Sequence, residues 1–221
     1  MDGFLLVNKP PGPTSHDVVE EIRLCAGGER IGHAGTLDPF AEGLLIVLAG
    51  GYTKKSAEFM GLPKKYRAVL RLGMRSNTHD IEGDLIPAKE VVIPQREDVE
   101  LALEKFKGEI LQVPPQFSAI KVKGKKAYEE ARAGRTTELE ARKVHVSELS
   151  TVWYNYPILT LDAAVSSGTY IRSLARDIGE ALGTGAVLSA LRREAVGAYQ
   201  LKDAVEFTSL SSQNWKNFVI Q

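Results

Sequence analysis

A single acidic residue in a rigid turn is the first candidate for chemistry in this sequence. Asp38 lies between Leu37 and Pro39 in the run GHAGTLDPFAEGLL, just before an apolar stretch that ends near Leu48. Proline restricts the backbone of the residue before it and lacks an N–H, so Asp38 is predicted to adopt a fixed extended or turn conformation. Such a turn would present one carboxylate at the edge of a sheet. The alternative is an Asx-turn, in which the side chain bonds only its own backbone.

The elements that must position this turn can be predicted from the apolar pattern. Alternating or continuous apolar runs predict strands, and apolar residues spaced three or four apart predict helices. The predicted strands are residues 3–9, 44–48, 66–72, 142–156 and 158–166, with a strand pair ending at 196. The predicted helices are a first helix capped by Thr14 and Asp17 and ended by Gly27 and Gly28, then residues 53–60, 97–107, 125–133 and 169–182. Residues 112–124 are predicted to form an extended loop, and the tail from residue 210 receives no assignment.

Strands and helices mix without a regular strand–helix–strand repeat. This order predicts an α+β fold, with a mixed, largely antiparallel central sheet and flanking helices. We expect a catalytic domain over residues 1–205 and a short C-terminal tail over residues 206–221.

Composition narrows the class of protein. The chain has 221 residues, of which 43% are hydrophobic and 25% charged, as in ordinary globular proteins. The single cysteine, Cys25, excludes an internal disulfide framework. The N-terminus lacks the features of a signal peptide, and no apolar run approaches the roughly 20 residues of a membrane span, so a cytoplasmic protein is expected. The four scattered histidines show no zinc spacing, so no metal is expected.

Six segments in order resemble the TruB branch of the pseudouridine synthases. The Asp38 run resembles the active-site motif of that family. The others are GFLLVNKPPGPTSHDVV, KKYRAVLRLG, SNTHDIEGD, PPQFSAIKVKGKKAYEEARAG and SSGTYIRSLARDIGEALGTGAVLSALRREAVG. Together they cover about residues 3 to 200. The resemblance implies the pseudouridine synthase fold and an enzyme that isomerises a uridine in the tRNA T-loop, at position 55. The reaction is redox-neutral and uses one substrate, so no cofactor is expected.

The resemblance implies three catalytic residues. Asp38 would be the carboxylate that acts on the ribose C1′ or on the base. Attack on the sugar, attack on the base and a glycal route all remain open. Arg172, in GTYIR, would keep that carboxylate ionised, because a guanidinium holds its charge and can bind two carboxylate oxygens at once. Tyr66, in KKYR, would stack on the extruded base and take part in removing the C5 proton. The alternatives are a surface arginine and a half-buried strand tyrosine.

Further residues match substrate-binding positions of the family. His33 would insert into the T-loop in place of the extruded base, Asp80 would be a second site acid, and Leu191 would form a pocket wall. The alternatives are a neutral loop histidine, a solvated turn aspartate and a core leucine. The full set of predicted substrate-binding residues is His33, Lys64, Asp80, Lys123, Lys126, Tyr170 and Leu191.

Basic clusters flank these motifs although the net charge is zero. The chain has 28 basic and 28 acidic residues, which alone argues mildly against a nucleic-acid partner. The basic residues nevertheless gather at 64–67, 121–135 and 192–193. A lysine-rich run is usually a solvated face. Beside the family motifs, however, these clusters favour a surface for the tRNA phosphates.

Three rival functions remain. An RNA-guided, dyskerin-like synthase shares the TLDP and Lys-Pro motifs, but it has an RNA-binding PUA domain for which this chain is expected to be too short. A non-catalytic tRNA chaperone would not need Asp38, Tyr66 and Arg172 together. A nucleoside hydrolase would not need the lysine clusters. We therefore expect a monomer that acts on the T-arm of tRNA without a guide RNA, a protein partner or a membrane.

Overall fold

The computed structural model describes residues 1–221 apart from 119–120, 123–124, 128–129, 131–134 and 136. The chain folds as two compact units: residues 1–67 with 190–221 form unit 1, and residues 68–189 form unit 2. Strands β4 (Lys64–Leu72) and β12 (Ala186–Val196) each contribute residues to both units.

Unit 1 is built around a strand that is buried along nearly its whole length. β3 pairs antiparallel with β1 and β2 and parallel with β12, while β14 extends the other edge of β1 and β13 pairs with β12. Residues 43–49 of β3 are all buried, as its apolar run predicts. The elements wholly inside this unit are β1 (Gly3–Lys9), α1 (Ser15–Cys25), β2 (Ile31–Ala34), β3 (Glu42–Ala49), η1 (Gly50–Lys55), α2 (Ser56–Gly61), β13 (Tyr199–Gln200), η2 (Leu201–Asp203), β14 (Val205–Glu206), η3 (Phe207–Ser209) and η4 (Trp215–Phe218).

The first helix begins where the sequence predicts. Thr14 accepts a hydrogen bond from the backbone N–H of Asp17, and the Asp17 carboxylate accepts one from the backbone N–H of Thr14. This capping box holds the start of α1 and confirms the sequence prediction. Gly27 and Gly28 follow its end with positive φ values of 69° and 86°.

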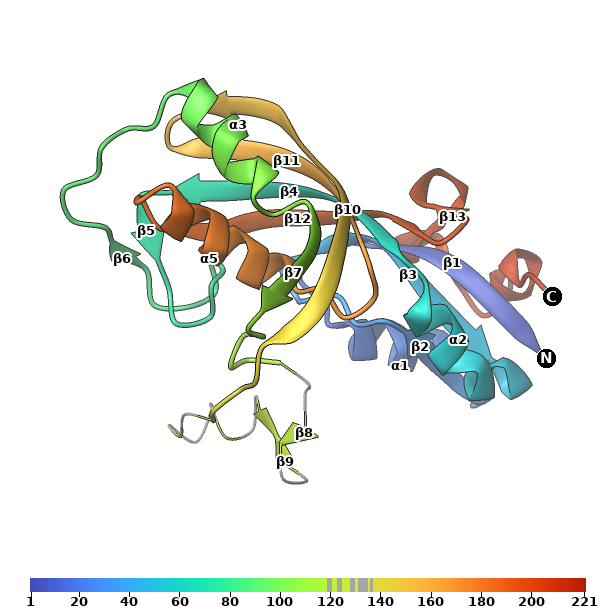
Figure 1. Cartoon of the computed structure of the whole chain (residues 1–221). Helices are drawn as coiled ribbons and strands as arrows, with labels where there is room; N and C mark the ends of the chain where they lie inside the picture. Colours follow the sequence, from blue (N-terminus) through green and yellow to red (C-terminus); the bar gives the residue numbers. More distant parts are fainter. Residues whose placement is uncertain (119–120, 123–124, 128–129, 131–134, 136) are drawn as a thin grey trace. The chain divides into compact units, whose positions relative to one another are not determined.

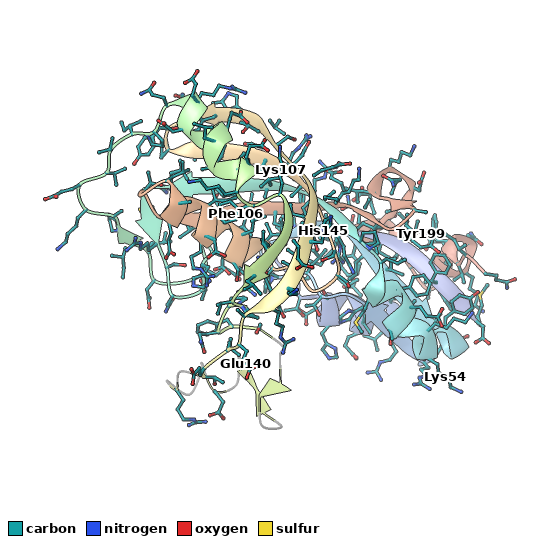
Figure 2. All side chains as sticks on the ribbon, in the orientation of Figure 1. Lys54, Phe106, Lys107, Glu140, His145 and Tyr199 are labelled. Atoms are coloured by element: carbon teal, nitrogen blue, oxygen red, sulfur yellow. The ribbon has the colours of Figure 1, made fainter. Side chains whose placement is uncertain are left out.

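The core of unit 1 contains an aromatic cluster. Phe4 lies 5.2 Å from Tyr199 and 5.3 Å from Phe59 between ring centroids; Figure 2 labels Tyr199. The unassigned tail also packs here: Trp215 is 1% exposed, and the backbone of Ile220 pairs with that of Phe4. The two ends of the chain therefore lie side by side (Figure 1).

Unit 2 holds further strands of the ten-stranded sheet, and its helices among the described residues include α3 and α5. Its strand order is β12, β4, β11, β10, β7, and the pairs β7–β10 and β10–β11 are antiparallel. Helix α3 contacts both β10 and α5, as Figure 1 shows. The elements wholly inside this unit are β5 (Met74–Arg75), β6 (Ile86–Pro87), α3 (Arg96–Glu104), β7 (Gly108–Gln112), β8 (Lys121–Val122), β9 (Lys125–Lys126), β10 (Arg142–Asn155), β11 (Ile158–Val165) and α5 (Ile171–Ala181).

The α+β class with a mixed, largely antiparallel sheet is confirmed, and three local predictions differ from the structure. Strand β7 was not predicted, because its partner β10 lies about 30 residues further along the chain. The helix predicted over residues 125–133 is wrong at its start, where Lys125 and Lys126 pair with β8 as a strand; much of the rest lies outside the described residues. The predicted strand pair ending at 196 is the single strand β12, with the short β13 beside it.

Candidate active site

The Asp38 loop connects β2 and β3 in unit 1 and is clamped through its backbone. Ser15, which is 1% exposed, accepts a hydrogen bond from the N–H of Leu37 at 2.9 Å and donates one to its carbonyl oxygen at 3.1 Å. On the other side of Asp38, the N–H of Ala41 donates to the Asp38 carbonyl oxygen at 3.1 Å. Asp38 itself is half-buried. The main chain on both sides of this carboxylate is therefore fixed.

A buried lysine also holds this loop. Lys9 ends β1 and is fully buried. Its ammonium group donates to the carbonyl oxygens of Pro10 and Pro13, both at 2.8 Å, and to that of Pro39 at 3.2 Å. One cation thus joins the Lys-Pro turn of the N-terminus to the proline that follows Asp38.

Arg193 is the third buried polar residue at the loop. It is 1% exposed and donates to the carbonyl oxygens of Leu44 at 2.7 Å and Gly35 at 2.9 Å. The interpretation of residues 192–193 as an exposed basic cluster is therefore wrong for Arg193. Lys9, Ser15 and Arg193 were not predicted as site residues, and alternation along β12, which turns neighbouring side chains to opposite faces, was the available signal for Arg193.

The other predicted site residues of unit 1 lie on its strands. His33, on β2, has a pKa below the ordinary histidine value, mainly because of burial and also because of the nearby Arg193 and His16 charges. Its buried Nδ1 has no hydrogen-bond partner within the described part of the chain. Tyr66 is half-buried on β4, and Leu191, on β12, is 7% exposed. A neutral imidazole suits stacking on bases.

The described structure gives no support to the predicted phosphate-binding role of the lysines. Lys64 is 8% exposed, and its ammonium group donates to the carbonyl oxygens of Met60 and Leu62, at the end of α2. Burial, with the Arg193 charge as a smaller cause, lowers its pKa to about 8. Lys123 lies outside the described residues, as does the side chain of Lys126. A phosphate-binding role for these three lysines stays a prediction.

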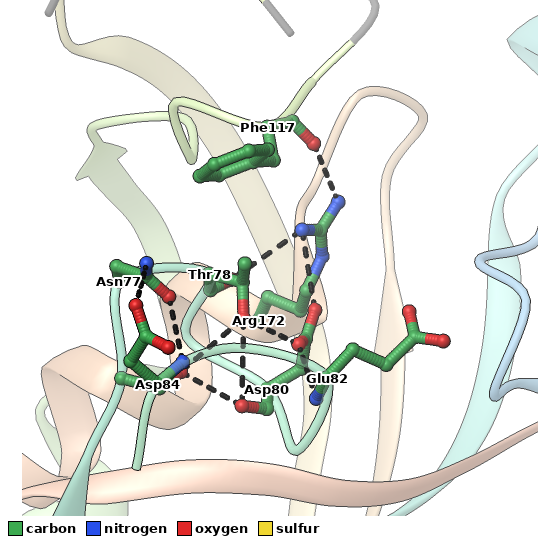
Figure 3. A network of polar contacts seen from close by, with 8 residues as sticks. Asn77, Thr78, Asp80, Glu82, Asp84, Phe117 and Arg172 are labelled. Carbon is green, nitrogen blue, oxygen red and sulfur yellow. Dashed lines mark hydrogen bonds and ion pairs between the residues drawn. The ribbon is translucent and has the colours of Figure 1, made fainter. Parts of the chain in front are cut away.

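In unit 2, Arg172 and Asp80 meet in a buried charge pair (Figure 3). Arg172 lies on the first turn of α5 and is 7% exposed, while Asp80 is 2% exposed. The guanidinium donates to Asp80 Oδ2 at 3.3 Å, to the Thr78 carbonyl oxygen at 3.4 Å and to the Phe117 carbonyl oxygen at 2.9 Å. The alternatives of a surface arginine and a solvated turn aspartate are therefore wrong.

The Asp80 carboxylate is held from its other side as well. Its Oδ1 accepts from the Thr78 hydroxyl at 2.5 Å and from the Glu82 N–H at 3.0 Å, as Figure 3 shows. The loop is attached to β12, because the N–H of Leu188 donates to the His79 carbonyl oxygen and the N–H of Ile81 donates to that of Leu188. Arg172 thus rests on a carboxylate that cannot easily move.

Tyr170, the last predicted residue, caps α5 and is half-buried. Its N–H donates to the side-chain oxygen of Gln112 at 2.8 Å, and the Gln112 amide donates to the Tyr170 carbonyl oxygen at 3.1 Å. Gln112 is 1% exposed and was not predicted as a site residue. It fixes the helix end that carries Arg172.

The structure therefore brings Arg172 and Asp80 together within unit 2, and it gathers His33, Arg193 and the Asp38 loop within unit 1. The pairing of Arg172 with Asp38 stays a prediction. Among the described residues, no group of histidine, cysteine and acidic side chains is arranged to hold a metal ion, and no helix is long and apolar enough to span a membrane.

Comparison with protein families gives two matches. Residues 23–171 match the model of the TruB family pseudouridylate synthase N-terminal domain, and residues 172–219 match that of the tRNA pseudouridylate synthase B C-terminal domain. These matches confirm the family predicted from the motifs. The domain boundary expected near residue 205 stays a prediction.

Curated relatives carry the same family name. Proteins named tRNA pseudouridine synthase B are 46% identical in Burkholderia lata, 44% in Thermobifida fusca and 41% in Haemophilus influenzae. The matches cover 96%, 96% and 95% of this chain, but 65%, 75% and 67% of the relatives, respectively. The chain thus spans about two thirds to three quarters of their length.

Solved structures confirm the fold. A chain of a Cbf5–Nop10–Gar1 complex matches with a TM-score of 0.74 at 30% identity, over 99% of this chain and 57% of the other. A chain of an H/ACA RNP bound to a substrate RNA containing 2′-deoxyuridine matches with a TM-score of 0.70 at 28% identity, over 99% of this chain and 56% of the other.

Proposed function

This chain belongs to the TruB family of pseudouridylate synthases, and we propose that it isomerises a uridine of tRNA to pseudouridine, at position 55 of the T-loop. The observation that carries the proposal is the clamped loop on which the motif aspartate, Asp38, stands. A reacting carboxylate must be held in place, because small displacements of a catalytic group cost much of the rate.

The proposed reaction needs only groups that the chain can supply. The bond between ribose C1′ and N1 of the base breaks, and a bond forms between C1′ and C5. The proton of C5 is lost and N1 gains one, so atoms and electrons balance without a second substrate or a redox partner. We therefore propose that no cofactor takes part.

Asp38 is the proposed nucleophile or base. Its carboxylate would attack the substrate, or stabilise and then deprotonate a cationic sugar, as carboxylates do in glycosidases. Tyr66 would stack on the extruded base and help remove the C5 proton, and His33 would fill the place that the base leaves. The motif resemblance supports these roles, and the pKa of His33, which burial lowers below the ordinary histidine value, supports a neutral stacking group.

Arg172 is the proposed counter-charge of Asp38. A carboxylate in a closed pocket tends to take up a proton, and a neighbouring guanidinium opposes this. The motif GTYIR supports the role. The hydrogen bonds that its guanidinium donates to Asp80 and to the Phe117 carbonyl oxygen support an arginine with a fixed orientation. Asp80 would act through Arg172, and Tyr170 would contact the substrate beside it.

The test is a reconstitution with purified protein and an unmodified tRNA transcript, without guide RNA. Pseudouridine is mapped by its carbodiimide adduct and primer extension, and proton loss is followed as tritium released from C5-labelled uridine. We expect one stop, at position 55, which a transcript with cytidine at that position loses. Binding without product would favour a chaperone, and released uracil a hydrolase. Product only with added guide RNA and protein partners would favour an RNA-guided enzyme.

We further propose that the protein acts as a monomer on the T-arm. Light scattering during size-exclusion chromatography, with and without an isolated T-arm stem-loop, measures the stoichiometry. A one-to-one complex that yields pseudouridine is expected. A two-to-two complex would contradict this proposal without affecting the assignment of the reaction.

A further inference from the structure

Arg193 contacts the backbone on both sides of the Asp38 loop. Its Nε donates to the carbonyl oxygen of Leu44, inside β3, at 2.7 Å. Its two terminal nitrogens donate to the carbonyl oxygens of Gly35 at 2.9 Å and of Thr36 at 3.5 Å, at the other end of the loop. One rigid guanidinium therefore bridges the chain before Asp38 and the chain after it.

We propose that Arg193 is a positioning residue for the Asp38 carboxylate: by holding both ends of the loop, it sets where this carboxylate stands. The inference rests on the proposed function. Arg193 is not proposed to touch a reacting atom, and it acts through the main chain of residues 35–44. This role differs from that of Arg172, which would act on the carboxylate directly.

The local sequence supports this arrangement. Arg193 and Gly43 are partners in the parallel pairing of β12 with β3. A Cβ atom on Gly43 would lie 2.5 Å from the carbonyl oxygen of Arg193 and 2.7 Å from the backbone nitrogen of Arg193. Gly43 also has a φ of +104°. Only glycine allows the two backbones to approach this closely without strain. The motif glycine therefore places the Arg193 side chain against the loop.

Arginine suits this task better than lysine. The guanidinium carries five N–H donors in a planar fork, which can bond several carbonyl oxygens in fixed directions. A lysine ammonium would preserve the charge but cannot reach Leu44 and Gly35 with the same geometry. Arg193 also helps to lower the pKa of His33 and of Lys64, so its charge acts on two predicted substrate-binding residues.

The neighbouring arginine provides a matched control. Arg192 lies on the same strand, but its side chain is 50% exposed and pairs with Glu194 at 3.3 Å. Successive residues of a strand face opposite sides, so Arg192→Lys makes the same chemical change away from the Asp38 loop.

The first arm of the test measures the loop itself. Hydrogen exchange followed by mass spectrometry on peptides covering residues 33–44 reports the opening of the loop, whether or not the protein is active. We expect faster exchange in Arg193→Lys and wild-type exchange in Arg192→Lys. Unchanged loop exchange in Arg193→Lys would overturn the proposal.

The second arm separates positioning from stability. Leu201→Ala, in the hydrophobic core of unit 1, is the stability control, since Leu201 is 7% exposed. The measurements are made at a temperature at which circular dichroism shows that every variant is folded. The rate of pseudouridine formation is measured in a single turnover with saturating protein, and the affinity for tRNA is measured by filter binding. We expect Arg193→Lys to react about tenfold to hundredfold more slowly with little change in affinity, and Leu201→Ala to react at nearly the wild-type rate.

Each result decides one question. An equal loss of rate in Arg193→Lys and Leu201→Ala would show that Arg193 only stabilises the fold, and would overturn the positioning role. A wild-type protein without product would refute the proposed function instead, while the exchange arm would still decide whether Arg193 holds the loop.

Discussion

The two units hold their candidate site residues by opposite means. In unit 1 the Asp38 loop is held through its backbone, by Lys9, Ser15 and Arg193. In unit 2 the Arg172 side chain is held directly by another charged side chain, that of Asp80, together with carbonyl oxygens. The hydrogen bonds of this backbone clamp are made by Leu37, Ala41 and the main chain around them, and none of them uses the side chain at position 38. The buried charge pair consists of the two side chains themselves, so removing one partner leaves an uncompensated charge.

The largest expected effect is that of Asp38→Asn, which tests the first half of this comparison. The change removes the carboxylate charge but none of the backbone bonds of Leu37 or Ala41. We expect the single-turnover rate to fall by about 1,000-fold or more, with tRNA affinity and melting temperature nearly unchanged. Asp84→Asn is the control, because Asp84 is an exposed loop aspartate.

Two results would contradict this expectation. Residual isomerisation above a few per cent of wild type, with deamidation of the introduced asparagine excluded by mass spectrometry, would refute the catalytic role. A large drop in melting temperature would show that the Asp38 side chain, and not only the backbone clamp, maintains the loop.

The next largest effect concerns the free energy of unfolding, and it compares the Asp80–Arg172 charge pair with the backbone clamp at Asp38. Asp80→Ala leaves the buried Arg172 charge without its carboxylate, which costs about 3 to 5 kcal/mol when a buried pair is broken. Ser15→Ala leaves the buried N–H and carbonyl of Leu37 without partners and should cost about 1 to 3 kcal/mol. Urea unfolding measures both, and Ser209→Ala, an exposed serine bonded to the Glu206 carbonyl, is the control. A larger loss of unfolding free energy in Ser15→Ala than in Asp80→Ala would contradict the difference between the two units.

A smaller effect is expected for Arg172→Lys, which keeps the charge. Lysine cannot bond Asp80, Thr78 and Phe117 at the same time, so the cation loses its fixed direction. We expect the single-turnover rate to fall about tenfold to hundredfold, as for a misplaced catalytic group. Arg176→Lys, one turn further along α5, is the control for the helix. A near wild-type rate in Arg172→Lys would remove Arg172 from the catalytic set.

The parts of the fold that were predicted correctly depend on local interactions. The capping box of Thr14 and Asp17 spans three residues, and the buried run of β3 needs no knowledge of its partners. Strand β7 escaped prediction because its pairing with β10 is distant in the sequence. The prediction of Lys125–Lys126 as helix was wrong for a different reason, because these residues pair with β8, which lies close to them in the sequence.

The candidate site shows the same difference between what local sequence predicts and what distant contacts decide. Asp80 and Arg172 were predicted from motif resemblance, but their partnership was not, because 92 residues separate them. Lys9 and Arg193 were not recognised as supports of the Asp38 loop, because lysine and arginine are seldom fully buried and composition gives no sign of it. On β12 only the alternation of Leu191, Arg192 and Arg193 distinguishes the inward arginine from the outward one.

The smallest predicted effect concerns His79, which lies beside the Arg172 network. Burial, together with the charges of Arg176 and Arg172, lowers its pKa from 6.5 to about 4. Above pH 6.5 the histidine is neutral in both the folded and the unfolded chain. Between pH 6.5 and 4 the unfolded chain takes up a proton first, so stability falls as the pH falls, and below about pH 4 this loss stops growing.

Replacing His79 with asparagine should remove this pH dependence. Asparagine tolerates the positive φ of 64° at this position, so the backbone should not be strained. The histidine is only partly buried, so we expect the difference in unfolding free energy between wild type and His79→Asn to change by about 1 to 2 kcal/mol between pH 7 and 4. Taking this difference cancels the other titrating groups, such as Asp177, whose pKa is raised by burial. His145→Asn, at an exposed position of β10 labelled in Figure 2, is the control. If both variants follow the wild-type pH curve, the protonation of His79 does not contribute to the stability of the Arg172 network.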